Sequence, residues 1–386
     1  MEIAVTSHWK TATPLTKSVK SPIKRVSIPR ETHTEQIARN LESALHALGE
    51  LFRHGDRAPT RSFPNDPYFN ESFWPMGYGQ LTNAGKRRSY ELGKWFRKRY
   101  NSFLSDEFSP KDVFMLSTYP DRCLVSASAV LAGLFPPKAR QVWDKDLAWQ
   151  PLPVHTVPVE DDEVLSMSKR CPRLGTSKTS DPGIRNIKFV SEYSGWNATD
   201  LKQVATLQTN LEIYSSFNST FTPPWVGELD SKILLYITAV EQVRYTLTEE
   251  MKRLLTGPFW SNLLTYFDDV ITGTSTPKFL MLSAHDGTIV SVLNGMGVFD
   301  MSPPGFAAAV VWELKRKDGV YHVNLLYRRA DKQLSVLYFK ECGRDCSYLW
   351  FKARMSALAV DGSDWEKECG RGGMFKKSIK EPTPKM

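Results

Sequence analysis

Two short apolar runs of the same design constrain the fold of this chain more than any other feature. Residues 113–117 and 279–283 have the composition of buried strands, and each is followed by a turn and the start of a helix. Strands that are buried on both faces are typical of parallel sheets covered by helices. The pattern predicts an α/β fold in which a mixed, mainly parallel sheet is flanked by helices.

A third turn carries the densest chemistry in the sequence, the run LFRHGDRAP at residues 51–59. His54 stands between Arg53 and Arg57, whose planar guanidinium groups suit phosphate oxygens. A neutral imidazole has a free nitrogen lone pair and can act as a nucleophile. Gly55 lets the backbone come close to a ligand. The motif predicts a phosphate cradle with a nucleophile inside it. Pro59 is the fifth informative residue among the seven at positions 53–59, which is too many for a chance match.

The two apolar runs supply further polar residues at matching positions. Arg122 follows the first run, and His285 and Asp286 follow the second. Open α/β sheets bind ligands at the carboxyl ends of their strands, where helix N-termini favour anions, so we expect these side chains to meet around a phosphate. His155 is expected to be structural, with a contact to the ligand as the alternative.

The rest of the chain is predicted to form a scaffold around these turns. The strand that leads into Arg53, within residues 41–52, is the weakest local fit because Gly49 and Glu50 interrupt its apolar pattern. Helices are predicted over residues 84–103 (capped by Thr82 or Asn83), 121–134, 230–255, 259–271 and 288–295, and a hairpin turn at 317–319.

Composition divides the chain into three parts. Residues 1–40 are polar and basic without an apolar signal core, and are predicted to be a disordered or altered N-terminal segment. Residues 41–369 are predicted to form one domain, with a smaller helical lobe inserted within about 141–230. Residues 370–386 are predicted to be a basic tail. No stretch approaches the roughly 20 apolar residues of a membrane span.

Charge and cysteine content restrict the partners and the compartment. The formal charge of +8 favours anionic partners, but there is no aromatic–basic stripe of the kind that stacks nucleic-acid bases. The five cysteines lack paired CxxC motifs, which argues against a zinc site, and Cys123 is expected to be a buried thiol. The sequence has three glycosylation sequons, at Asn70, Asn197 and Asn218. Together with four pairable cysteines, they favour the secretory pathway.

The motifs resemble those of the histidine acid phosphatases, the clade-2 branch of the histidine phosphatase superfamily, and in particular its prostatic, lysosomal and insect venom type. The resemblance extends from about residue 48 to 369. Besides the run at 51–59, the matching stretches are 79–82 (GQLT), 117–122, 153–158 (PVHTVP), 171–173 (CPR), 283–286 (SAHD) and 364–369. It implies a phosphoglycerate mutase-like fold with a smaller helical lobe over the site.

The resemblance also implies an activity, the hydrolysis of phosphate monoesters through a phosphohistidine. His54 would be the nucleophile and Asp286 the proton donor, and four residues would hold the phosphate: Arg53, Arg57, Arg122 and His285. No metal or other cofactor is expected, since the arginines supply the positive charge. A carboxyl donor must be protonated when the substrate is bound, which predicts an acidic optimum.

Disulfides, location and assembly follow from the same resemblance. It implies that Cys171 pairs with Cys369 and Cys342 with Cys346, which leaves Cys123 free. It implies a glycoprotein that is secreted or in the lysosomal lumen, although this chain has no recognisable signal peptide, and it suggests a homodimer without a stable membrane anchor.

Two alternatives remain at this stage. One is a phosphatase of the same superfamily with a narrower substrate, such as an inositol phosphate or a lysophosphatidate. The other is a catalytically weakened secreted glycoprotein that binds phosphorylated ligands. Every matched catalytic position is filled, which argues against the second, but Gly287 stands where this type of phosphatase usually has threonine. The sequence does not specify the physiological ester.

Overall fold

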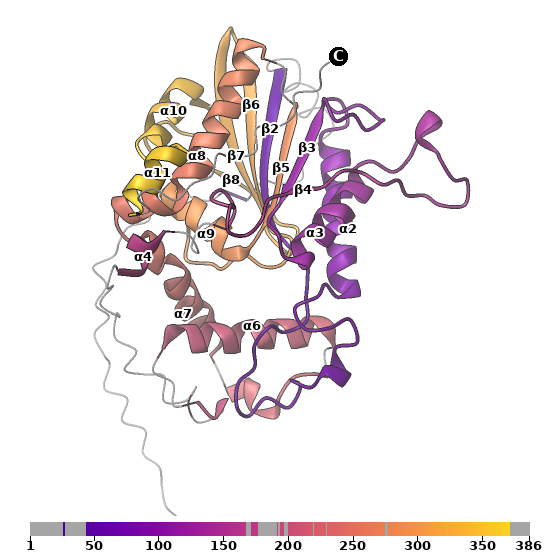
Figure 1. Ribbon diagram of the computed structural model, residues 1–386, viewed down its shortest axis with the longest axis vertical. Helices are drawn as coiled ribbons and strands as arrows, with labels where there is room; N and C mark the ends of the chain where they lie inside the picture. The colour runs from indigo at the N-terminus through magenta and orange to yellow at the C-terminus, as the bar shows by residue number, and fades with distance from the viewer. Residues whose placement is uncertain are drawn as a thin grey trace, which may run out of the picture.

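One mixed sheet forms the centre of the molecule (Figure 1). The computed structural model describes residues 26–27, 44–166, 171–176, 191, 194–196, 200–218, 220–228, 230–274 and 277–370 of the 386. Within them, nine strands follow the order β1-β8-β7-β6-β2-β5-β3-β4, with β9 paired to β7. The strands are β1 (Val26–Ser27), β2 (Ala44–Arg53), β3 (Val113–Ser117), β4 (His155–Thr156), β5 (Phe279–Ala284), β6 (Ala309–Lys317), β7 (Val320–Arg328), β8 (Leu334–Leu337) and β9 (Cys346–Ser347). Because β6, β8 and β9 run opposite to all the others, the expected mixed, mainly parallel sheet is confirmed.

Helices cover both faces of the sheet, α8 to α11 on one side and α2 with α3 on the other (Figure 1). The α-helices are α2 (Asn83–Arg99), α3 (Asp121–Leu134), α4 (Pro172–Thr176), α6 (Leu201–Phe217), α7 (Ser231–Val243), α8 (Glu249–Thr272), α9 (Asp286–Gly295), α10 (Tyr348–Ser356) and α11 (Gly362–Glu368). The 3-10 helices are η1 (Glu71–Phe73), η2 (Ala139–Gln141), η4 (Pro224–Glu228) and η5 (Arg244–Thr246). In the described part of the chain, no helix has the length and apolar character to cross a membrane.

Strand β2, which fitted its sequence pattern poorly, is the central strand of the sheet. It pairs in parallel with β5 on one side and antiparallel with β6 on the other. A Cβ atom on Gly49 would lie 2.8 Å from Leu263 of α8, so this glycine lets the helix approach the strand closely. The irregular residue is therefore explained by the packing of α8.

Glu50 points to the opposite face of β2 and is fully buried. Neither oxygen of its carboxyl has a hydrogen-bond partner among the described residues. Burial raises the pKa of Glu50 well above its usual value, and the charge of nearby Arg328 only partly opposes this. Arg328 is itself buried and lies over the ring of Trp95, with 5.3 Å between its Cζ and the ring centroid. Glu50 is therefore a buried carboxyl without a hydrogen-bond partner in the described part of the core.

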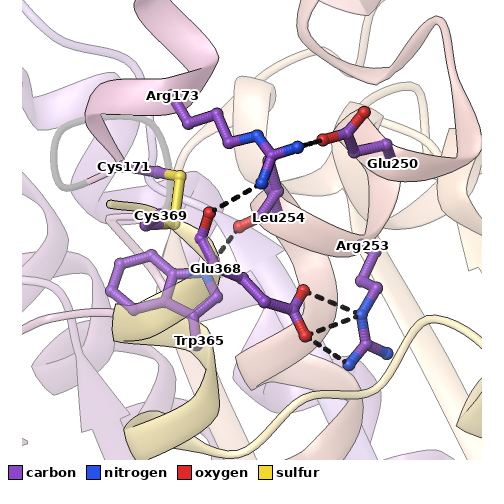
Figure 2. The surroundings of a disulfide bond; sticks show 8 residues. All are labelled: Cys171, Arg173, Glu250, Arg253, Leu254, Trp365, Glu368 and Cys369. Carbon is purple, nitrogen blue, oxygen red and sulfur yellow. Dashed lines mark hydrogen bonds and ion pairs between the residues drawn. A yellow bond between two sulfur atoms is a disulfide. The ribbon is translucent and has the colours of Figure 1, made fainter. Parts of the chain in front are cut away.

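Most predicted elements agree with the structure, but the division between the two long helices was wrong. The break falls at η5 and Leu247, because the Thr248 hydroxyl accepts from the Met251 N–H and starts α8 there. α8 then continues through Pro258, which lies between the two predicted helix ranges. A proline leaves the carbonyl four residues before it without its helical donor. The Trp365 indole N–H donates to that carbonyl, on Leu254, at 2.6 Å (Figure 2).

Figure 2 shows the contacts that α11 and Cys369 make with α8 and with the start of α4. A disulfide joins Cys171 to Cys369, and the guanidinium of Arg253 binds the carboxylate of Glu368 at 2.8 Å. A second disulfide joins Cys342 to Cys346, and Cys123 is free and buried. These are the pairings that the resemblance implies.

A smaller lobe made largely of α6 and α7 lies beyond one end of the sheet (Figure 1). Its apolar cluster contains Phe63 and Trp74 from the segment after β2, as well as Leu207 and Leu234 from the two helices. The lobe thus uses residues on both sides of the 141–230 segment, and the domain boundaries remain a prediction.

Replacing Glu50 with glutamine tests the buried carboxyl. Because its pKa is raised in the folded protein, Glu50 contributes stability at low pH that is lost as the pH rises from the ordinary glutamate pKa through the folded one. We expect the wild type to lose about 1–3 kcal/mol more free energy of unfolding between pH 4.5 and 7.5 than the Glu50→Gln variant does. Urea unfolding at both values measures this, with the exposed Glu71→Gln as control. Equal losses in the wild type and Glu50→Gln would show that Glu50 does not behave as described.

Candidate active site

All six residues predicted to form the phosphate site line one cavity of about 430 Å³. They are Arg53, His54, Arg57, Arg122, His285 and Asp286. They come from the carboxyl ends of β2 and β5, from the loop after β2 and from the first turns of α3 and α9. The helical lobe closes the other side of the cavity with residues of α6 and α7.

His54 is buried at the end of β2, with 3% of its surface exposed. Its Nδ1 lies 2.8 Å from the carbonyl oxygen of Gly55. A carbonyl only accepts, so Nδ1 carries the proton and Nε2 keeps its lone pair. Burial, and then the charges of His285 and the three arginines, hold the pKa of His54 well below its usual 6.5. The imidazole is therefore neutral, and nucleophilic, even in mildly acidic solution.

Close backbone packing holds the loop that carries His54. A Cβ atom on Gly55 would lie 2.3 Å from the carbonyl oxygen of Gly85 in α2, so only glycine fits. The Gly55 N–H donates to the Ser126 hydroxyl at 2.9 Å, and this hydroxyl donates to the Arg122 carbonyl at 2.6 Å. Ser126, which sequence analysis missed, thus connects the nucleophile loop to the turn that carries Arg122.

Arg53 is the most restrained cation of the site. It is 3% exposed, its Nη1 donates to the Pro304 carbonyl at 2.7 Å, and its Cζ lies 3.9 Å from the centroid of Phe306. Its Nη2 lies 3.5 Å from Oδ2 of Asp286, and its Nη1 lies 3.8 Å from Oε1 of Glu212. The guanidinium is thus fixed between two carboxyl groups.

The three arginines of the site lie close enough together to repel one another. Burial, and then the charges of Arg122 and Arg53, lower the pKa of Arg57 to about 10. The Nε atoms of Arg53, Arg57 and Arg122 have no hydrogen-bond partner within the described residues. A bound anion would relieve the repulsion and accept from these donors.

His285 and Asp286 begin α9, where the first turn of the helix favours negative charge. Burial and the charge of Arg122 lower the pKa of His285 to about 3, so this ring is neutral as well. Burial opposes the ionisation of Asp286, but Arg53, His285 and the Gly287 N–H together lower the pKa of its carboxyl below the usual value. Asp286 is therefore ionised in the free site. Gln242 of α7 donates to its Oδ2 at 3.2 Å.

Gly287 does not disturb this helix start. Its N–H donates to Oδ1 of Asp286 at 2.9 Å, and a Cβ atom at this position would meet no other atom within 4 Å. A side chain would fit here, so the glycine enlarges the cavity beside Asp286 and leaves the helix intact.

Sequence analysis missed the contribution of the helical lobe to the cavity. The cavity-lining residues that it did not identify include Arg61, Lys202, Thr209, Glu241 and Gln242. It also did not identify Glu212, which lies beside Arg53 and lines a neighbouring cavity. None of them lies in a motif. The only available signal was the helical spacing of Lys202, Ala205, Thr209 and Glu212, which places them along one side of α6.

The other residues singled out in the sequence do not line the cavity. His155 stacks on Phe114 with 4.5 Å between the ring centroids and does not line the cavity. Cys123 is buried as expected, and its Sγ lies 3.8 Å from Nδ1 of His285. Asn70 and Asn218 are exposed, and Asn197 lies outside the described residues. Within the described chain, no group of three or more His, Cys, Asp or Glu side chains is arranged to hold a metal ion.

Comparison with known proteins identifies the family. The family model described as histidine phosphatase superfamily (branch 2) matches residues 44–328. The chain is 32% identical over 335 residues to prostatic acid phosphatase of Bos taurus, which covers 83% of this chain and 86% of that protein. It is 32% identical over 343 residues to human lysosomal acid phosphatase, with 83% and 78% covered.

Solved structures support the fold. A phytase from Klebsiella sp. ASR1 superposes with a TM-score of 0.59 at 16% identity, covering 85% of this chain and 98% of that one. The apo form of Hafnia alvei phytase gives the same values. At such low identity the likeness concerns the fold alone.

Proposed function

Because the chain belongs to branch 2 of the histidine phosphatase superfamily, we propose that it is an acid phosphatase that hydrolyses phosphate monoesters through a phosphohistidine on His54. The observation that carries the proposal is the state of His54. It is a neutral, buried imidazole with a free Nε2, and it lines the same cavity as three arginines. Such an arrangement binds a phosphoryl group and presents a nucleophile to it.

The first step transfers the phosphoryl group to His54. Nε2 attacks phosphorus, the P–N bond forms, and the ester P–O bond breaks. Arg53, Arg57 and Arg122 stabilise the charge on the non-bridging oxygens, and the short bond from Arg53 to Pro304 keeps that guanidinium in place. Asp286 gives its proton to the leaving alkoxide, which departs as the alcohol.

The second step returns the enzyme to its starting state. Asp286, now ionised, takes a proton from a water molecule whose oxygen attacks phosphorus. The P–N bond breaks, inorganic phosphate leaves, and Asp286 holds the proton again.

The protonation of Asp286 links binding to acidic pH. In the free site Arg53 and His285 lower the pKa of Asp286. A bound phosphate neutralises the arginines and adds negative charge next to the carboxyl, which raises its pKa. The proton donor is then present at acidic pH and is lost as the pH rises.

Location and partners follow the relatives. We propose a secreted or lysosomal glycoprotein, supported by the names of the relatives, the two disulfides and the exposed sequons at Asn70 and Asn218. Its partners would be small phosphate monoesters, without nucleic acid and without a stable membrane anchor.

A homodimer is also proposed, and the segment between α3 and β4 offers a surface for it. This arm extends away from the body of the molecule (Figure 1). It exposes Trp143 (57%) and Trp149 (40%), together with Val142 and Leu147. Large apolar side chains grouped on an extended arm are costly in water, which favours their burial against a second copy.

The alternative, a weakened glycoprotein that binds phosphorylated ligands, rested on Gly287 and on the irregular strand. Neither feature distorts the site, because β2 is the central strand and α9 starts at Asp286. An active phosphatase therefore remains the preferred function.

Steady-state hydrolysis of p-nitrophenyl phosphate tests the activity. We expect kcat to be highest in acidic solution and to fall towards neutral pH as Asp286 loses its proton. His54→Ala should reduce activity to background, and Asp286→Asn should lower kcat by about 10²–10⁴-fold. Folding of both variants is checked by circular dichroism. Comparable activity in the wild type and the folded His54→Ala variant would refute the mechanism.

Sedimentation velocity tests the arm. We expect the wild type to sediment as a dimer and Trp143→Glu as a folded monomer, because a buried charge would oppose the contact. Tyr236→Glu is the matched control, since Tyr236 is equally exposed (58%) but lies on α7. A wild type that sediments as a monomer, or a Trp143→Glu variant that stays dimeric, would exclude this interface.

A further inference from the structure

Glu212 is a second carboxyl, after Asp286, that lies beside Arg53 of the phosphate site, and no motif identifies it. On α6, the cavity-lining residues Lys202, Ala205 and Thr209 follow helical spacing, and Glu212 continues this row by one turn. Its Oε1 lies 3.8 Å from Nη1 of Arg53. Its side chain is one-third exposed and lines a neighbouring cavity of about 320 Å³.

Arg53 cannot move away from this carboxyl. Its Nη1 is bonded to the Pro304 carbonyl and its guanidinium lies on Phe306. The two ends of the guanidinium face Asp286 and Glu212. A phosphate that binds Arg53 must therefore compete with two carboxyl groups whose positions relative to the cation are fixed.

The charged groups that face Glu212 come from three parts of the chain. They are Arg53 from β2, Asp56 and Arg57 from the following loop, and Asp286 from α9. From α7, which packs on α6, the residues that share a neighbouring cavity of about 320 Å³ with Glu212 are Ser231, Leu234 and Leu235, none of which titrates. The local balance around Glu212 is two cations against two carboxylates.

Glu212 differs from the other ionisable groups in this balance. Burial raises the pKa of its carboxyl, with Arg53 opposing. The pKa values of His54, His285 and Asp286 are all lowered. Among these four groups, Glu212 is thus the one whose pKa is shifted upward, towards neutral pH.

We propose that Glu212 determines how the site binds phosphate esters through its contact with Arg53: protonated, it leaves Arg53 to the ester, and ionised, it competes for Arg53 and repels the ester. The inference rests on the proposed function and deepens it. It assigns to Glu212 the pH dependence of substrate binding, whereas Asp286 governs the chemical step. These two effects separate in kinetics, because kcat/KM reports the free enzyme and kcat reports the enzyme–substrate complex.

The test compares the wild type with Glu212→Gln in the hydrolysis of p-nitrophenyl phosphate at pH 5 to 7.5. Removing the negative charge of Glu212 from the surroundings of a bound phosphate is worth at least a factor of about ten in the affinity for that phosphate. We expect the KM of the wild type, relative to that of the variant, to rise about tenfold over this range, while kcat falls with pH in both. Glu212→Ser is the second variant if glutamine disturbs folding.

Glu241→Gln is the matched control. Glu241 lines the phosphate cavity and has a pKa raised mainly by burial, but it pairs with Arg244, at 3.6 Å. We expect this variant to keep the pH dependence of KM of the wild type. Equal pH dependence of KM in the wild type and Glu212→Gln, or the same change in Glu241→Gln, would overturn the role of Glu212.

Sulfate binding separates this inference from the proposed function. Sulfate keeps two negative charges throughout this pH range and needs no turnover, so titration calorimetry measures the site alone. We expect its affinity for the wild type to fall about tenfold from pH 5 to 7.5 and its affinity for Glu212→Gln to stay constant. If the wild type hydrolyses no ester, the proposed function fails while sulfate still decides the role of Glu212. An affinity for the wild type that is independent of pH would overturn it.

Discussion

The mutual repulsion of three arginines around a buried histidine is the constraint on which the rest of the site depends. Burial lowers the pKa of His54 most, and the charges of Arg53, Arg122 and Arg57 lower it further. The repulsion costs stability in the free protein, but together with burial it keeps the imidazole neutral, and it leaves guanidinium donors to a phosphate. An anion that enters the cavity relieves the repulsion. The same positive charges thus favour both the binding of phosphate and the neutral, nucleophilic form of His54.

The scaffold meets this constraint with rigid backbone close to the charges. His54 follows β2, the strand with neighbours on both sides at the centre of the sheet, and Gly55 packs directly on α2. The Ser126 hydroxyl joins this loop to the turn of Arg122. Groups held in this way cannot separate to lower their repulsion. The carboxyls of Asp286 and Glu212 lie beside Arg53, within 3.5 and 3.8 Å of its guanidinium.

The sequence predicts most of this arrangement because the catalytic chemistry lies in short local motifs at strand ends. The sheet, the turns and the six cavity residues follow from such patterns. Glu212 and Gln242 could not be predicted, since they approach the site through the packing of a separate lobe. The same holds for Pro258, whose unpaired Leu254 carbonyl is satisfied by Trp365 more than a hundred residues along the chain. Gly49 and Glu50 weaken the apolar pattern of β2, and their surroundings are visible only in the folded protein. Gly49 contacts α8, and Glu50 lies near Arg328.

Trapping the covalent intermediate tests the central claim most directly. The protein is mixed with p-nitrophenyl phosphate, quenched in alkali to protect the acid-labile P–N bond, digested and examined by mass spectrometry. The account predicts one phosphoryl group on the peptide that contains residues 51–59, located on His54 and absent when His54 is replaced by alanine. Turnover of the ester without that label, or a label on another residue, would contradict it.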